Sequence, residues 1–197
     1  MQPNSKAIIS RMVEQQIGKQ KKFREFALKE VNKKVNEAKR EMVAEFNAHP
    51  VTKEIEMGPK AENVSGTLGG YGNLFTFIGF EKGEDPIMPI RMMLEKILVS
   101  YESSNKGRLM FKIQYPSKEE LFSISPMPWA SGRSWLQGIE LGMSGLGSYL
   151  YKGNKSISSS RSGSAVQIKS NLGRGRFKNT QYISNIINKF TKRIQSI

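Results

Sequence analysis

The sequence predicts an α+β fold, in which a long N-terminal helix and a C-terminal helix pack on a small, mostly antiparallel sheet with extended loops or arms. Three observations support this. Apolar residues recur at helical spacing near the N-terminus, residues 108–116 alternate between apolar and polar side chains, and a second helical stripe lies at the C-terminus. The 197 residues suffice for one domain of ordinary size, or for one domain with a long extension.

Residues 5–48 are predicted to form a helix, either continuous or broken near Gly18, because apolar side chains step by three or four residues along one face. This stripe consists of Ala27, Val31, Val35, Ala38, Met42 and Phe46. The helix is expected to end at His49-Pro50, since a residue before proline avoids the helical conformation. This position gives His49 an ordinary structural role rather than a catalytic one.

The next segments are interpreted as two strands, a loop and a helix. Residues 51–58 are predicted to form a short strand, and residues 58–73, which include five glycines, a loop. The apolar run 74–80 is interpreted as a strand covered on both sides, because both of its faces carry apolar side chains. Residues 86–101 are predicted to be helical from their apolar spacing.

Residues 108–116 form the clearest predicted strand, with one buried and one exposed face. Ser117 to Glu120 fit a capping box before a short helix. Residues 135–141 indicate another short helix. Further along, we expect strands at 146–151 and 165–169, a mobile Ser/Gly-rich segment at 152–164 and a basic loop at 171–179.

The last predicted helix begins at a Thr180 cap and carries a continuous apolar stripe. The stripe consists of Tyr182, Ile183, Ile186, Ile187, Phe190 and Ile194. The chain is thus divided into a core domain at 1–128 and a basic, Gly/Ser-rich extension at 129–197, which is expected to pack on the same core.

Positive charge is concentrated in the extension. The chain holds 31 Lys and Arg against 17 Asp and Glu, a net charge of +14. Residues 129–197 carry +10 of it and contain one acid, Glu140, whereas residues 50–128 are almost neutral. Such asymmetry is typical of a surface that meets polyanions or acidic protein faces.

No pattern for catalysis or metal binding is present. The chain has no Cys and one His, which excludes a disulfide scaffold, a thiolate metal site and a two-His site. The glycine-rich segment 66–72 lacks the Lys-Ser/Thr of a phosphate-binding loop, and Ser144 lies one residue short of a G-x-S-x-G motif. We therefore expect no enzyme, no cofactor and no metal, and neither a membrane span nor a secretory signal.

A nucleic-acid-binding function through residues 152–193 is the alternative that the charge leaves open. Cations that neutralise phosphates, with aromatic rings nearby for base stacking, are how single strands are often held, and Phe177 and Tyr182 lie close in sequence. The predicted basic contacts are Arg161, Lys169, Arg174, Arg176 and Lys178.

Four pieces of the first half, in this order, resemble the tail-completion or minor tail proteins at the neck of long-tailed bacteriophages. They are Val35–Phe46, His49-Pro50-Val51, Leu74–Phe80 and Pro86–Leu98. They resemble the family's amphipathic helix, Pro-Val loop, strand ending in a Gly-aromatic pair, and Pro-marked helix. Thr52 is followed by Lys53, where the family usually has Thr-Gly. Residues 131–151, 160–170 and 177–190 are also similar to neck or tail proteins of large phages.

The resemblance implies a structural virion protein rather than an enzyme. Copies would form a ring, a hexamer or a dodecamer, at the head–tail junction, between head-closure proteins and the tail tube or tail terminator. DNA would pass through the ring, and the protein would be found in the virion neck or tail and, during assembly, in the host cytoplasm. The expected assembly contacts are Gly66, Gly69, Gly70, Tyr71, Trp129, Trp135, Tyr182 and Ile186.

Overall fold

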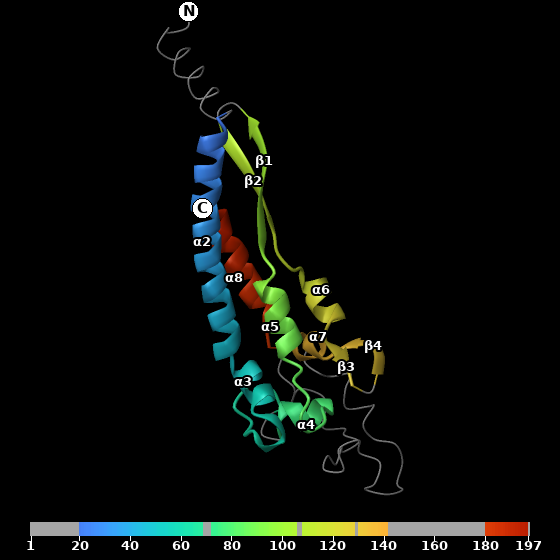
Figure 1. Cartoon of the computed structure of the whole chain (residues 1–197). Helices are drawn as coiled ribbons and strands as arrows, with labels where there is room; N and C mark the ends of the chain where they lie inside the picture. The colour runs from blue at the N-terminus through green and yellow to red at the C-terminus, as the bar shows by residue number, and fades with distance from the viewer. Residues whose placement is uncertain (1–19, 69–71, 106–107, 129, 142–179, 197) are drawn as a thin grey trace, which may run out of the picture.

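The fold is that of an elongated α+β molecule, as predicted. The computed structural model describes residues 20–68, 72–105, 108–128, 130–141 and 180–196. A long helix α2 (Lys21–Ala48) runs beside helix α8 (Ile183–Gln195), and the strands form two small antiparallel sheets. Figure 1 shows that the start of α2 and the hairpin of β1 (Leu98–Asn105) and β2 (Arg108–Gln114) extend away from a body of short helices.

Helices α2 and α8 meet through the two apolar stripes that the sequence predicts, which confirms both. Phe46 of α2 stacks on Tyr182, with ring centroids 5.8 Å apart. Residues 21–34 of α2 bury no side chain completely, so the helix enters the core only with its second half. The buried residues of the two helices are Val35, Ala38, Met42, Phe46, Ile183, Ile186, Ile187 and Phe190.

The strand predicted at 51–58 is wrong, because this segment forms helix α3 (Pro50–Glu56), followed by the 3₁₀ turn η1 (Gly58–Lys60). Pro50 occupies the first helical turn, where its missing N–H costs nothing. The Nδ1 atom of His49 accepts a 3.3 Å hydrogen bond from the Val51 N–H. The same proline that ends α2 therefore starts α3.

The strand predicted at 74–80 is also wrong, because helix α4 (Leu74–Ile78) lies there. The Asn73 side chain accepts a 2.9 Å hydrogen bond from the Thr76 N–H and caps the start of the helix. Gly79, with φ of +91°, ends it in the left-handed conformation. The segment is apolar on all sides because α4 is a largely buried helix, and not because it is a strand in a sheet that is covered on both faces.

The helix predicted at 86–101 is correct only over residues 88–95. These residues form helix α5 (Met88–Glu95), and strand β1 begins three residues later, at Leu98. Strand β1 pairs antiparallel with β2, with a register shift between Tyr101 and Ser103. Strand β2 confirms the predicted strand at 108–116, and its alternate residues are half-buried.

Helix α6 (Lys118–Ser123) confirms the predicted capping box of Ser117 and Glu120. Strands β3 (Pro126–Met127) and β4 (Ala130–Ser134) then lead to the predicted helix α7 (Trp135–Glu140). The Thr180 cap is wrong, because α8 begins after Tyr182 and has no capping side chain at that residue.

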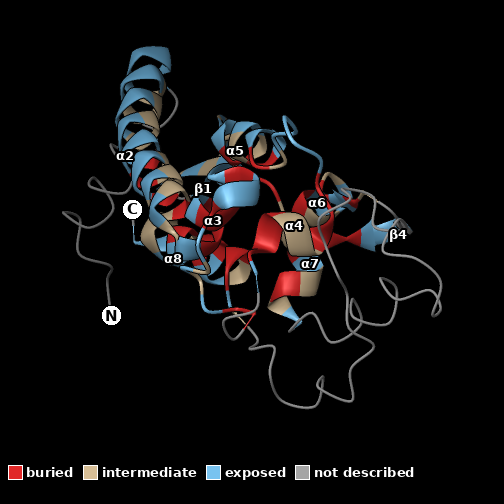
Figure 2. Ribbon diagram, turned by 90° about the horizontal axis from the view of Figure 1, so that it is seen from below, coloured by how far each residue is buried: buried red, intermediate tan, exposed pale blue. Residues whose placement is uncertain are grey.

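One hydrophobic core joins the described parts of both predicted segments. It includes Met42, Phe46 and Ile90 from the first segment, and Trp135 and Ile187 from the second. Figure 2 shows the buried residues gathered between the short helices, while the outer side of α2 stays largely exposed. The strands predicted at 146–151 and 165–169, the mobile segment and the basic loop lie outside the described residues.

Candidate assembly surface

The arm, by which we mean residues 21–34 of α2 together with β1 and β2, leaves apolar side chains in solvent. Arg24 lies over the Tyr101 ring, 5.3 Å from its centroid, and Tyr101 meets Phe111 edge-on at 6.1 Å. The first contact joins the hairpin to α2, and the second joins β1 to β2. Even so, Phe26 and Leu98 are 62% and 67% exposed. Exposed apolar groups on a projecting element are typical of a protein contact surface.

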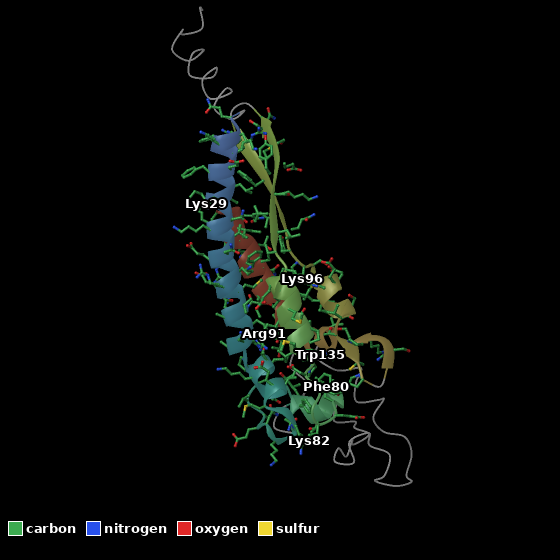
Figure 3. The ribbon with its side chains drawn as sticks, in the orientation of Figure 1. Lys29, Phe80, Lys82, Arg91, Lys96 and Trp135 are labelled. Carbon is green, nitrogen blue, oxygen red and sulfur yellow. The ribbon has the colours of Figure 1, made fainter. Side chains whose placement is uncertain are left out.

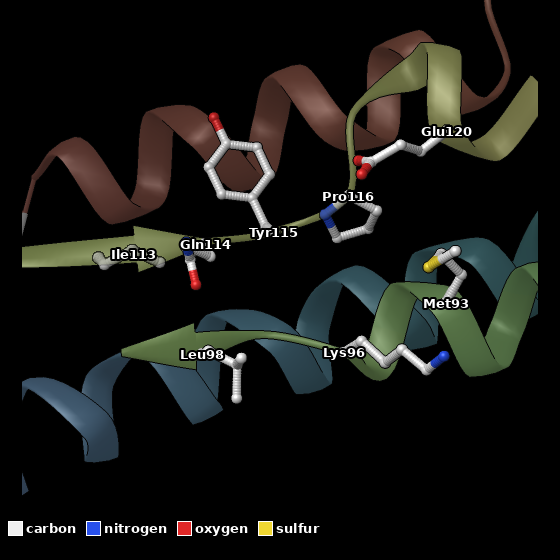
Figure 4. A pocket seen from close by; sticks show the side chains of 8 residues that line it. All are labelled: Met93, Lys96, Leu98, Ile113, Gln114, Tyr115, Pro116 and Glu120. Carbon is white, nitrogen blue, oxygen red and sulfur yellow. The ribbon is translucent and has the colours of Figure 1, made fainter. Parts of the chain in front are cut away.

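A cleft of about 450 Å³ lies at the foot of the hairpin, where α5 leads into β1 and β2 leads into α6. Figure 4 shows Met93, Lys96 and Leu98 on one side of it and Glu120 on the other. A few polar groups set among apolar ones are the ordinary lining of a binding pocket. The cleft is lined by Met93, Lys96, Leu98, Ile113, Gln114, Tyr115, Pro116 and Glu120.

The wall of this cleft is attached to α8. The Tyr115 ring meets Phe190 edge-on, with centroids 5.3 Å apart. The Thr191 hydroxyl donates a 3.2 Å hydrogen bond to the Tyr115 hydroxyl. The cleft therefore has a fixed wall, because one of its lining side chains packs on a core residue of the C-terminal helix.

Ion pairs fasten α8 to α2. Glu45 lies 3.2 Å from the Lys189 ammonium and 2.5 Å from Arg193, whose Nε is also 3.0 Å from Glu41. Burial acts to raise the pKa of Glu45, but the hydrogen bonds and charges of Arg193 and Lys189 hold it below its usual range. Lys189 and Arg193, which lie within residues 152–193, are therefore both engaged by carboxylates of α2.

The buried carboxylate of Glu54 binds the backbone at two positions, one within the loop that precedes α4 and one at the first residue of α4. Its two oxygens accept 2.8 Å hydrogen bonds, one from the Leu74 N–H and one from the Ser65 N–H. Both oxygens thus serve backbone donors, which assigns this carboxylate to structure rather than to acid–base chemistry. The sequence showed Glu54 beside Glu56 but gave no sign of these partners, which lie 11 and 20 residues away.

Near the junction of α2 and α3, Tyr182 is completely buried and its hydroxyl is hydrogen-bonded to the Thr52 hydroxyl. Burial raises the pKa of Tyr182 far above its usual range. The His49 ring packs on Tyr182, with centroids 4.5 Å apart. Burial, and then the Lys189 charge, lower the pKa of His49. The only histidine in the sequence is therefore part of the packing.

Three of the predicted assembly contacts are corrected by the structure. Trp135, Tyr182 and Ile186 are at most 3% exposed, so they stabilise the core and offer no contact to a neighbour. Trp135 meets the Phe80 ring edge-on at 5.8 Å. Gly66 lies on the exposed loop with φ of +64°. The predicted residues outside the described part of the chain are Gly69, Gly70, Tyr71, Trp129, Arg161, Lys169, Arg174, Arg176 and Lys178.

The described residues hold no group of three or more His, Asp or Glu side chains that could bind a metal ion. None of the helices in this part of the chain combines the length and the apolarity that crossing a membrane requires. No protein-family model, curated protein or solved structure matches the chain. The proposals that follow therefore rest on the residues and their geometry, together with the resemblance noted above.

Proposed function

We propose that the chain is a structural virion protein of a tailed bacteriophage, whose copies form a ring at the neck. The cleft beside the exposed hairpin supports this proposal, because it combines apolar groups, a cation and an anion at the base of the arm that projects in Figure 1. Glu45 forms an ion pair with Lys189, and Glu54 and Glu140 accept hydrogen bonds from backbone N–H groups. The resemblance of the first half to neck proteins directs the proposal to the head–tail junction, where DNA would pass through the ring. One of the resembling pieces departs from the family, because residues 74–80 contain helix α4 where the family has a strand.

Ring closure needs two different surfaces on each copy, so that one meets the other around the circle. The cleft is one such surface. The hairpin is a second, because β1 and β2 form a two-stranded sheet whose outer backbone edges have no strand beside them in the described chain. A hexamer or dodecamer built this way would contact head-closure proteins on one side and tail-tube or tail-terminator proteins on the other.

The experiment compares two substitutions of exposed apolar residues. Leu98→Asp places a charge in the cleft, whereas Met57→Asp, at a residue 60% exposed on the end of α3, serves as the matched control. Neither change removes a buried contact. Imaging and mass measurement of the assembled protein should show rings for the wild type and for Met57→Asp, and loss of rings for Leu98→Asp. Rings that form equally well in both variants would exclude the cleft from assembly.

A further inference from the structure

The outer surface of α2 carries two lengthwise strips of charge, one basic and the other mainly acidic. Because residues in an α-helix turn by about 100° each, residues 22, 29, 33 and 40 fall within about 40° of one another. All four are cations, Lys22, Lys29, Lys33 and Arg40, and all four are exposed. They lie opposite the buried stripe of the helix. We call these four residues the basic strip; Figure 3 labels Lys29 on it.

The acidic strip lies beside it, on the flank of α2 that faces α8. Its acids are Glu30, Glu37, Glu41 and Glu45, and one cation, Lys34, lies among them. Two of its carboxylates, Glu41 and Glu45, bind the cations of α8. Within the described part of the chain, by contrast, no member of the basic strip forms an ion pair. Among the residues that the structure describes, the acidic strip therefore has cation partners for two of its carboxylates, and the basic strip has no anion partner.

From Lys22 to Arg40 the strip spans about 27 Å at the helical rise of 1.5 Å per residue. Lys29 and Lys33 are four residues apart, a spacing at which like charges repel and weaken the helix. An anion bound along the strip relieves this repulsion. Phe26 lies on the same outer side of α2 and is 62% exposed. The surface thus combines a line of cations with one accessible ring.

We propose that the basic strip binds the phosphodiester backbone of nucleic acid. A linear polyanion matches an extended line of one charge sign better than an acidic protein does, because lysine is depleted from the centres of protein interfaces. The exposed ring of Phe26 adds a stacking surface that a single strand can use. This inference does not depend on ring assembly, and it concerns a surface other than residues 152–193.

Binding of the full chain to a 30-base-pair duplex and to a single strand of equal length tests the proposal, measured by fluorescence anisotropy between 50 and 200 mM NaCl. The test variant carries Lys22→Gln, Lys29→Gln, Lys33→Gln and Arg40→Gln. The matched control carries Lys53→Gln, Lys60→Gln, Lys82→Gln and Lys112→Gln, which removes the same charge from exposed residues elsewhere. Glutamine keeps a good helix propensity, so α2 should remain folded.

The test variant should bind at least tenfold more weakly than the wild type, and its salt slope should fall by about 2.8 to 3.6, because each of the four phosphate contacts contributes about 0.7 to 0.9. The control should change much less, and a variant with Lys22→Arg, Lys29→Arg and Lys33→Arg should retain binding. If the chain binds the single strand as well as the duplex, Phe26→Ala should weaken binding to the single strand and leave binding to the duplex unchanged. Equal losses in both four-site variants, or no binding of either probe by the wild type, would overturn the proposal.

Discussion

The carboxylate of Glu140, at the end of α7, accepts a 2.6 Å hydrogen bond from the backbone N–H of Ser184, in the first turn of α8. The sole acid of residues 129–197 thus lies at the positive end of the C-terminal helix. It accepts a hydrogen bond from an N–H group at the start of α8, where the Tyr182 N-cap position supplies no capping side chain. The charge asymmetry of the sequence therefore includes one carboxylate with a structural function.

Glu140→Ala should lower the free energy of unfolding by about 1 to 2 kcal/mol, because it removes both the cap and its charge. Urea unfolding followed by circular dichroism measures this value. Glu62→Ala, which removes an exposed loop carboxylate, is the matched control and should change stability by less than about 0.5 kcal/mol. A loss no greater than that of the control would contradict the capping role.

Glu54→Ala should be more damaging, because it leaves the N–H groups of Ser65 and Leu74 without their acceptor inside the protein. An unsatisfied buried donor costs about 1 to 3 kcal/mol, so a total loss of about 2 to 4 kcal/mol is expected. Lys53→Ala, an exposed change on the same helix, supplies the control. Near-equal stability of the two variants would show that the loop does not depend on this carboxylate.

The buried pair of Thr52 and Tyr182 should show coupling in a double-mutant cycle. Tyr182→Phe and Thr52→Val each leave one buried hydroxyl unpaired, and each should cost about 1 to 2 kcal/mol. The double variant removes both hydroxyls and should cost less than the sum of the two. Strict additivity in urea unfolding would mean that the hydrogen bond contributes nothing to stability.

His49 should make stability depend on pH in a range where the other side chains titrate little. Its folded-state pKa lies below the ordinary value of 6.5, so the unfolded chain takes up the proton first as the pH falls. The free energy of unfolding should therefore be nearly constant above pH 6.5 and decline as the pH falls from 6.5 through the lower folded-state pKa. His49→Asn keeps a capping side chain and should flatten the decline. An unchanged pH profile in that variant would assign the dependence to other groups.

The sequence predicts the elements whose patterns are long or carry a complete local signal. Helices α2 and α8 have extended apolar stripes, β2 alternates, and α6 has both members of its capping box. The run that forms α4 was ambiguous, because a short apolar segment fits a buried helix as well as a buried strand. Its flanking Asn73 and Gly79, a cap and a left-handed terminator, were the signals that separate the two.

The boundary between α5 and β1 was missed for a different reason. Leu98 continues the helical spacing that begins at Ile90, yet it is 67% exposed, so it belongs to a strand face rather than to the core. The cleft and the engagement of Lys189 and Arg193 by α2 depend on contacts between distant segments. Periodicity within one segment contains no information about them. Trp135 and Tyr182 were misassigned because a large aromatic residue suits a core and an interface equally well.

The central proposal, ring assembly at a phage neck, is tested most directly by asking whether purified tailed phage particles contain the chain. The measurement combines mass spectrometry of fractionated particles with averaged images of necks that carry a tagged chain. We expect the chain in intact particles, with the tag in a ring of six or twelve copies at the head–tail junction. Absence of the chain from mature virions and isolated tails would contradict the proposal.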